Sequence, residues 1–183
     1  MISDGACAAP DLDRWLPDAG VRTHHRRTIA ADPAEVWRIA RAIRLEETRA
    51  LGRLVRWRIP GTPAALAYDE LFRAYPFTVL EDGERHLVAG LCGRIWTLER
   101  DYPHIGGPDE FAAWHEPGTV RVAFAHWVRP HERGAELCSE ARVQPVDRTA
   151  RLRLRALWAV IGHFEPLIAS EPLSLAARRA GRR

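Results

Sequence analysis

The sequence predicts a single α+β domain, in which a curved antiparallel sheet packs against a long C-terminal helix. Three observations support this prediction. A helix-start signal follows the first strand-like stretch, several strand-like segments lie between residues 77 and 143, and the last apolar stretch, residues 147 to about 170, repeats at helical spacing. The chain has 183 residues, which is enough for one domain with a hydrophobic core.

The first strand is expected over residues 21–31, and charge on both of its faces indicates the edge of a sheet. The residues Asp32-Pro33-Ala34-Glu35 then combine an acidic N-cap, a proline at the first helical position and a glutamate at the third. A helix should therefore follow, with a buried stripe of Val36, Ile39, Ala40 and Ile43. A second short helix is expected over residues 45–55, with Leu51, Leu54 and Val55 facing inward.

The middle of the chain reads as an antiparallel meander that is interrupted by a loop. Residues 68–74 predict a short helix, and the loop 101–118 contains a helical turn at 108–114. Alternating apolar residues and turn signals predict the strands. They are expected at 77–80, at 85–91 after a turn at 81–84, at 94–98 with Trp96, at 120–128 and at 135–143.

The last apolar stretch is expected to form the long helix that closes over the sheet. Asp147 is its N-cap, and Pro166 should kink or end its first segment, because proline removes a backbone donor. The pair Glu171-Pro172 predicts a second break. The apolar stripe that this helix turns to the sheet consists of Leu154, Leu157, Val160, Ile161, Phe164 and Ile168.

The composition excludes several classes of function. All 27 basic residues are arginine, and neither lysine nor asparagine occurs, which indicates a GC-rich bacterial genome. The arginines are mostly interleaved with acids, so we expect no nucleic-acid binding. Residues 1–20 lack a signal-peptide pattern and no apolar run reaches transmembrane length, so we expect a soluble cytoplasmic protein without integral membrane association.

No metal or cofactor site is expected. The cysteines Cys7, Cys92 and Cys138 are far apart and lack metal-ligand spacing, so we interpret them as thiols in a reducing compartment. His24 and His25 point to opposite faces of a strand and cannot bind one ion together. Phosphate-binding and dinucleotide-binding glycine motifs are also missing from the sequence.

The element order resembles the helix-grip fold of the SRPBCC superfamily, which includes START domains, birch-pollen-allergen relatives and polyketide cyclases. The residues that carry the resemblance are 28–37 and the terminal helix, with weaker support from 77–80, 90–96 and 140–143, which look like marks of an uncharacterised bacterial subgroup. The resemblance covers residues 21–177 and implies one domain there, with an apolar cavity between sheet and helix. The prolines, glycines and aspartates of residues 1–20 predict a flexible arm, and the arginine-rich residues 178–183 predict a basic disordered tail. The resemblance implies no catalytic residue.

Strand parity provides the candidate site residues. His126 shares an apolar face with Val122 and Phe124, a pattern that favours a hydrogen-bonded core histidine, and it is also the candidate general acid or base. Glu140, beside Arg142, would be a site candidate on the concave face, but the pattern favours the convex face. Trp96, Trp114 and Trp127 are candidates for a pocket wall. The expected ligand-binding set is Trp96, Val122, Phe124, His126, Leu157, Ile161 and Phe164.

Three functions remain open at this point. The first is binding of a small hydrophobic ligand, such as a lipid, polyketide or aromatic metabolite, in the cavity. The second is a cyclase-type or aromatase-type enzyme in which His126 or Glu140 moves protons. The third is a protein-interaction module with a collapsed cavity, and homodimer formation is left open.

Overall fold

A curved five-stranded antiparallel sheet forms the centre of the structure, a computed structural model that describes residues 9–97 and 102–182. The strand order is β1-β5-β4-β3-β2, so β1 lies at an edge, as its charged pattern predicts. The strands are β1 (Val21–Ile29), β2 (Thr78–Gly83), β3 (His86–Gly93), β4 (Val120–His131) and β5 (Gly134–Pro145).

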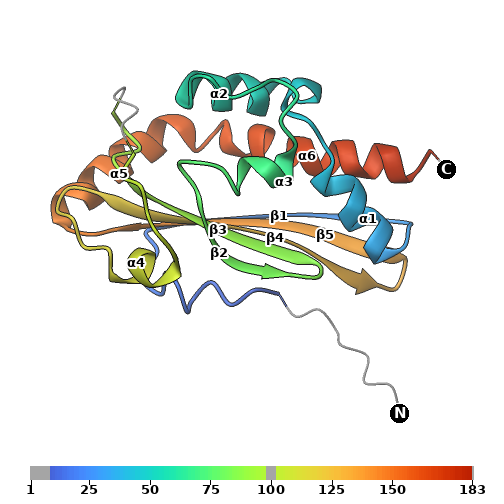
Figure 1. Ribbon diagram of the computed structural model, residues 1–183, viewed down its shortest axis with the longest axis horizontal. Coiled ribbons are helices and arrows are strands. Elements are labelled where there is room, and N and C mark those ends of the chain that lie inside the picture. Colours follow the sequence, from blue (N-terminus) through green and yellow to red (C-terminus); the bar gives the residue numbers. More distant parts are fainter. Residues whose placement is uncertain (1–8, 98–101, 183) are drawn as a thin grey trace, which may run out of the picture.

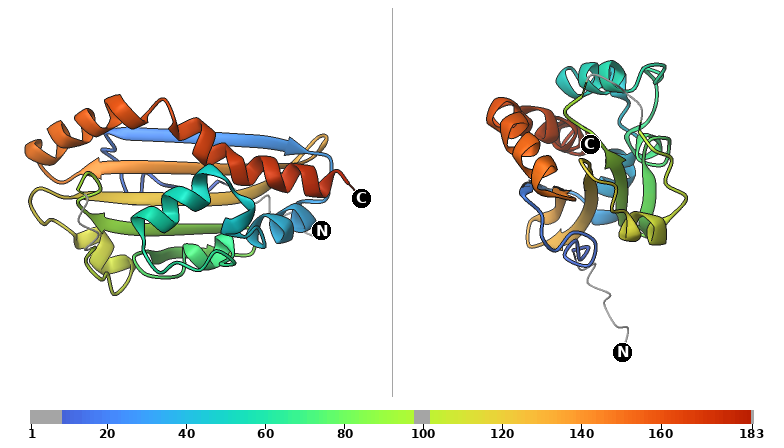
Figure 2. Two further views of the ribbon diagram at one scale, coloured as in Figure 1. Left: turned by 90° about the horizontal axis from the view of Figure 1, so that it is seen from above. Right: turned by 90° about the vertical axis from the view of Figure 1, so that its left-hand side faces the viewer.

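The helices lie mainly on one face of the sheet, which we call the concave face (Figures 1 and 2). This arrangement is a helix-grip fold and confirms the expected fold class, including the short helices after β1. The helices are α1 (Pro33–Arg41), the 3-10 helix η1 (Leu45–Glu47), α2 (Ala50–Arg58), α3 (Tyr68–Leu71), α4 (Pro108–Ala113), α5 (Arg148–Ile161) and α6 (Glu165–Ala180).

The start of α1 forms as the sequence predicts. The Asp32 carboxylate accepts hydrogen bonds from the backbone N–H groups of Ala34, at 2.8 Å, and Glu35, at 3.2 Å. The expected stripe of α1 is buried against α6 and the sheet, together with Trp37. The second helix begins later than expected, at Ala50, and Leu54 is 38% exposed instead of inward.

The C-terminal helix differs from its prediction in three ways. It breaks at residues 162–164, where α5 ends, and Pro166 lies in the first turn of α6. Pro172 causes no second break: its ring is buried inside α6, and Leu173 and Ala176 hold this half of the helix against the core. The expected disordered tail is wrong for residues 178–180, because α6 continues to a buried Ala180.

The convex face of the sheet is also covered. Residues 9–20, which were expected to be a loose arm, lie along this face, with Leu12, Trp15 and Leu16 buried. The Trp15 indole N–H donates to Glu81 at 2.6 Å, and Phe111 of α4 packs into the same cluster. Apolar burial therefore fixes this part of the arm, whereas residues 1–8 lie outside the described residues.

The expected strand at residues 94–98 is not a strand within its described part, 94–97, which forms a turn. Gly93 ends β3 with a positive φ of 136°, a conformation that favours glycine, and the chain leaves the sheet there. Trp96 is therefore carried on a turn beside the concave face. The β2–β3 turn also lies later than expected, because β2 extends to Gly83 after an irregularity between Val79 and Glu81.

Candidate functional site

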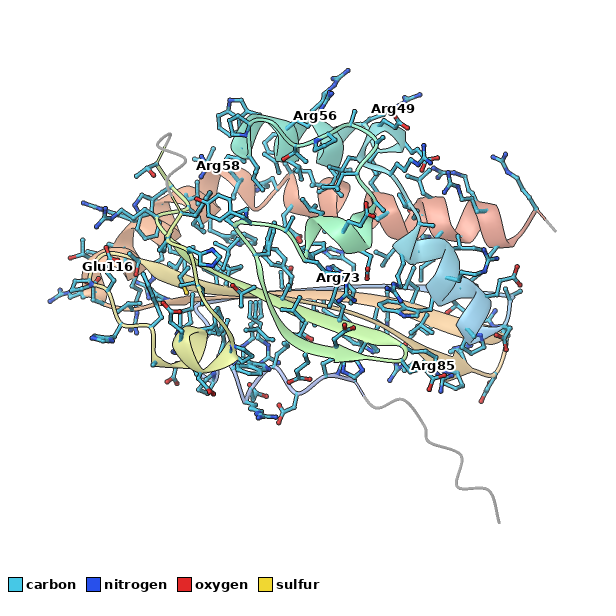
Figure 3. The ribbon with its side chains drawn as sticks, viewed as in Figure 1. Arg49, Arg56, Arg58, Arg73, Arg85 and Glu116 are labelled. Atoms are coloured by element: carbon cyan, nitrogen blue, oxygen red, sulfur yellow. The ribbon has the colours of Figure 1, made fainter. Side chains whose placement is uncertain are left out.

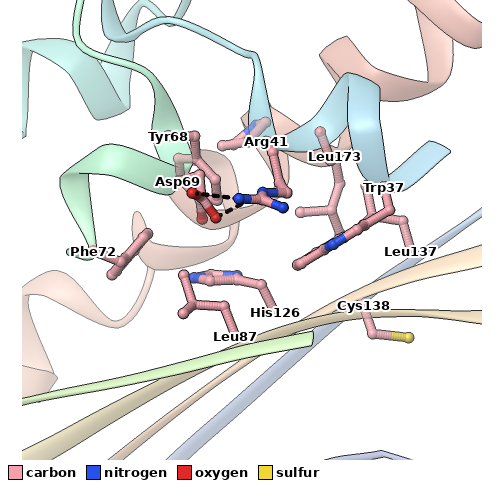
Figure 4. Close-up of a pocket in the computed structure, with 12 residues that line it drawn as sticks. Trp37, Arg41, Tyr68, Asp69, Phe72, Leu87, His126, Leu137, Cys138 and Leu173 are labelled. Carbon is pink, nitrogen blue, oxygen red and sulfur yellow. Dashed lines mark hydrogen bonds and ion pairs between the residues drawn. The ribbon is translucent and has the colours of Figure 1, made fainter. Parts of the chain in front are cut away.

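A small cavity lies at one end of the concave face, among β4, α1, α3 and α6 (Figure 4). Its volume is about 20 Å³, enough for one or two water molecules. The walls are mainly apolar, and the polar side chains that reach them come from His126 on β4, Trp37 and Arg41 on α1, and Tyr68 and Asp69 on α3. His126 of the sheet thus faces polar side chains from α1 and α3.

His126 is held in an aromatic environment that keeps it uncharged. Its ring centroid lies 4.6 Å from that of Phe72 and 5.0 Å from that of Tyr68, and the residue is only 6% exposed. Burial lowers the pKa of His126 to about 3, although the nearby Asp69 carboxylate opposes the shift. At neutral pH the imidazole is therefore neutral, and it is a poor proton donor for acid catalysis.

Two buried nitrogen atoms at this cavity have no hydrogen-bond partner among the described residues. They are Nε2 of His126 and the indole Nε1 of Trp37. The indole can only donate, whereas Nε2 of a neutral imidazole donates or accepts according to its tautomer. Because an unpaired buried polar group is costly, these two atoms mark a place where an oxygen-bearing group would bind favourably.

Asp69 is fixed at the rim of the cavity by two arginines. Arg41 contacts its carboxylate at 2.9 Å and Arg73 at 2.8 Å, and Arg73 also contacts Asp82 at 2.6 Å. Burial alone would raise the pKa of Asp69, but the hydrogen bonds from Arg73 and Arg41 hold the pKa of this carboxyl below its usual value. Asp69 is therefore an ionised anchor for α1 and α3.

Tyr68 completes the polar side of the cavity. Its hydroxyl is hydrogen-bonded to Ser139 of β5, and burial raises the pKa of this phenol above its ordinary value. Because Tyr68 stays protonated, it stays a hydrogen-bonding group rather than a base. The backbone bridge between Arg44 and Ala67 places Tyr68 and Asp69 over the sheet.

An aromatic row continues from the cavity along the concave face. Phe72 contacts Phe124 with ring centroids 5.4 Å apart, and Phe124 contacts Phe77 at 5.8 Å. Phe77 and Phe124 are only partly buried and join the cluster that Trp96 and Trp158 also reach. The cover over this part of the sheet is therefore incomplete.

The predicted ligand-binding residues fall into two groups. Val122, Phe124 and His126 lie on the concave face, where strand parity places them, and Trp96 is partly buried against the same cluster as Val122. Leu157 of α5 is partly buried. Ile161 and Phe164 are 39% and 60% exposed, so the expectation that they line the cavity is wrong in this conformation. The reason is that α5 turns Ala150 and Leu154 inward and ends at Ile161, after which the chain turns away.

Other sequence candidates lie on the convex face. Glu140 contacts Arg142 at 2.6 Å, and Arg142 also contacts Asp13 of the N-terminal arm at 2.5 Å. Glu140 therefore cannot act together with His126, which lies on the opposite side of the sheet. Trp114 and Trp127 likewise pack in the convex cluster and form no wall of the cavity.

The two adjacent histidines lie on opposite faces, as the alternation predicts. His24 stacks on Trp127 with ring centroids 5.6 Å apart, whereas His25 contacts Glu165 of α6 at 3.0 Å. Within residues 9–97 and 102–182, no group of three histidine, cysteine, aspartate or glutamate residues stands close enough to hold a metal ion. Cys92 and Cys138 are buried free thiols, and Cys7 lies outside the described residues.

Sequence reasoning missed Trp37, Arg41, Tyr68 and Asp69 as site residues. Strand parity ranks only residues on strands, and these four come from helices whose position over the sheet depends on tertiary packing. The adjacent tyrosine and aspartate at the start of the predicted short helix 68–74 were the available signal, but this pair belongs to no characteristic motif.

Comparisons with known proteins identify no family for this chain. No family model matches it, and no curated protein matches it. Protein CV1439 from Chromobacterium violaceum is 12% identical, with 86% of this chain and 95% of that chain covered and a TM-score of 0.39. Protein MLL2253 from Mesorhizobium loti is 13% identical, with 86% and 98% covered and a TM-score of 0.39. Ara h 8.0201 is 8% identical, with 89% and 99% covered and a TM-score of 0.30.

Proposed function

We propose that this chain binds a small hydrophobic ligand with an oxygen-bearing end, between the concave face of the sheet and the C-terminal helices. The observation that carries the proposal is the unpartnered pair, His126 Nε2 and Trp37 Nε1, at the end of a partly covered aromatic row. The oxygen-bearing end of the ligand accepts a hydrogen bond from Trp37 Nε1 and forms another hydrogen bond with His126 Nε2. The apolar part of the ligand packs on Phe77 and Phe124.

A ligand of this kind requires the site to open. The cavity of about 20 Å³ is far smaller than the roughly 300–1,000 Å³ of ordinary ligand pockets. The break at residues 162–164 provides a hinge, because the His25–Glu165 contact holds the start of α6 while α5 buries only Ala150 and Leu154. Moving α5 away exposes these two side chains and the partly buried Trp158, which costs about 4–5 kcal/mol. The contacts of the ligand must supply this cost in addition to the net binding free energy, which is about 8 kcal/mol for a micromolar complex.

We also propose that the protein is a bacterial, cytoplasmic member of the SRPBCC superfamily, and that its ligand is a lipid, a polyketide or an aromatic metabolite. The cyclase-type alternative retains only one of its two proton-moving candidates, because Glu140 lies across the sheet from His126.

The test is fluorescence titration with 1-anilinonaphthalene-8-sulfonate, which joins aromatic rings to an oxygen-rich anion. His126→Phe removes the polar atom and should weaken binding roughly twofold to tenfold, the value of one hydrogen bond. His24→Phe makes the same change on the convex face and should leave the affinity unaltered. The proposal fails if the wild-type protein does not bind the probe, or if both variants bind it equally well.

A further inference from the structure

The corner between α5 and α6 exposes an apolar surface that the proposed ligand site does not use. We define the α5–α6 corner as Val160, Ile161, Phe164 and Leu167, which are 68%, 39%, 60% and 68% exposed. Single exposed apolar residues are ordinary on proteins, but four large ones within eight positions of one chain segment indicate a surface that contacts something apolar.

The α5–α6 corner stands beside a helix that carries only positive charge. Helix α5 has exposed arginines at 148, 151, 153 and 155 and no acidic residue. Within the described part of the chain, none of these arginines has a carboxylate at salt-bridge distance. The acid at the start of α6, Glu165, is turned inward onto His25. Positive charge therefore fills the first half of α5, and apolar side chains fill its end.

Helix α2, in the same helical layer, repeats this combination. Leu54 and Trp57 are 38% and 49% exposed, and the helix contains no acidic residue. Arg49 and Arg56 project outward from it, away from the sheet (Figure 3). Glu171 of α6 caps the start of this helix, where its carboxylate accepts hydrogen bonds from three backbone N–H groups.

We propose that the α5–α6 corner docks on a membrane surface of anionic lipids. The apolar side chains enter the boundary between head groups and acyl chains, and the arginines of α5 contact the lipid phosphates. A second copy of this chain is a poorer occupant, because a two-fold contact would bring the same arginines face to face. The docking is peripheral: every helix in the described chain is too short or too polar to span a bilayer. The proposed membrane docking does not depend on ligand binding at the concave face.

The test is co-sedimentation of the full chain with two kinds of vesicle, phosphatidylcholine alone and phosphatidylcholine with about one third phosphatidylglycerol. We expect binding to the anionic vesicles that weakens as salt is raised. Phe164→Ser with Leu167→Ser should weaken binding roughly tenfold or more, and Arg153→Gln with Arg155→Gln should do likewise. These positions are exposed, so the variants should fold, which circular dichroism verifies.

The matched control removes two arginines elsewhere, by Arg38→Gln with Arg133→Gln. Arg38 lies on α1 and Arg133 in the β4–β5 turn, at the opposite end of the molecule from α5 (Figure 1). This control should keep at least half of the wild-type binding. Failure to bind anionic vesicles, or an equal loss in the control, overturns the proposal. A dimer in analytical ultracentrifugation that Phe164→Ser with Leu167→Ser dissolves would also overturn it, because a second copy would then cover the corner.

Discussion

Replacing His126 by phenylalanine should stabilise the protein while it weakens ligand binding. The substitution removes a buried nitrogen that has no partner, and such an atom costs about 1–3 kcal/mol. The larger ring also extends toward a cavity of about 20 Å³. At about 24 cal/mol per Å³, filling that volume adds at most about 0.5 kcal/mol. After some loss to imperfect packing, we expect the free energy of unfolding to rise by about 1–2 kcal/mol.

Urea unfolding followed by tryptophan fluorescence measures this change, since the chain has seven tryptophans. His24→Phe is the control, and its free energy of unfolding should stay within about 0.5 kcal/mol of wild type because the residue is exposed on the convex face. A loss of about 1 kcal/mol or more in His126→Phe would contradict an unpaired Nε2. It would show that Nε2 makes a hydrogen bond in solution, for example to water in the cavity.

Three further changes test the fold. Burial lowers the pKa of His126 to about 3, so between about pH 6 and pH 4 the imidazole gains a proton in the unfolded state but not in the folded state. As the pH falls through this range, the free energy of unfolding should decrease more steeply in wild type than in His126→Phe, by up to about 1.4 kcal/mol per pH unit. Glu171→Ala removes the side chain that accepts three backbone hydrogen bonds at the start of α2, and urea unfolding should show a loss of about 1–2 kcal/mol. Gly90→Ala would place a methyl group 2.6 Å from the Phe111 ring and should cost about 1–3 kcal/mol, whereas Gly107→Ala, with open space around it, should be nearly neutral by the same assay.

Each of these predictions has an outcome that contradicts it. Equal pH slopes in wild type and His126→Phe would mean that the histidine titrates alike in the folded and unfolded states. An unchanged Glu171→Ala would mean that water caps α2 equally well. Equal losses in Gly90→Ala and Gly107→Ala would mean that backbone freedom, and not the close approach of Phe111, decides the effect.

The strand faces were predictable because the side-chain alternation in β4 and β5 has a period of two. Once Val122 and Phe124 are assigned to the concave face, His126 must join them, and Glu140 and Arg142 must lie on the convex face. The start of α1 was equally predictable, because Asp32 and Pro33 act on their own helix without help from the rest of the fold.

The C-terminal helices were harder to predict, because helical spacing shows which residues share a stripe but not which stretch meets the sheet. The expected stripe at Val160, Ile161 and Phe164 lies at the exposed corner. The burial against α1 and β1 is instead made by residues such as Leu173 and Ala176, beyond the expected second break. The sequence around Pro172 predicts a helix break, and it could not show that packing against the core keeps α6 helical on both sides of this proline.

Ligand binding is tested most directly by mass spectrometry of small molecules released from the purified wild-type, His24→Phe and His126→Phe proteins. We expect one hydrophobic compound with an oxygen-bearing group, near one equivalent per chain, in wild type and His24→Phe. We expect a smaller amount in His126→Phe. A compound that His126→Phe retains in full would contradict the assignment of the polar end. The absence of any compound, together with no binding of 1-anilinonaphthalene-8-sulfonate, would contradict the ligand-binding function itself.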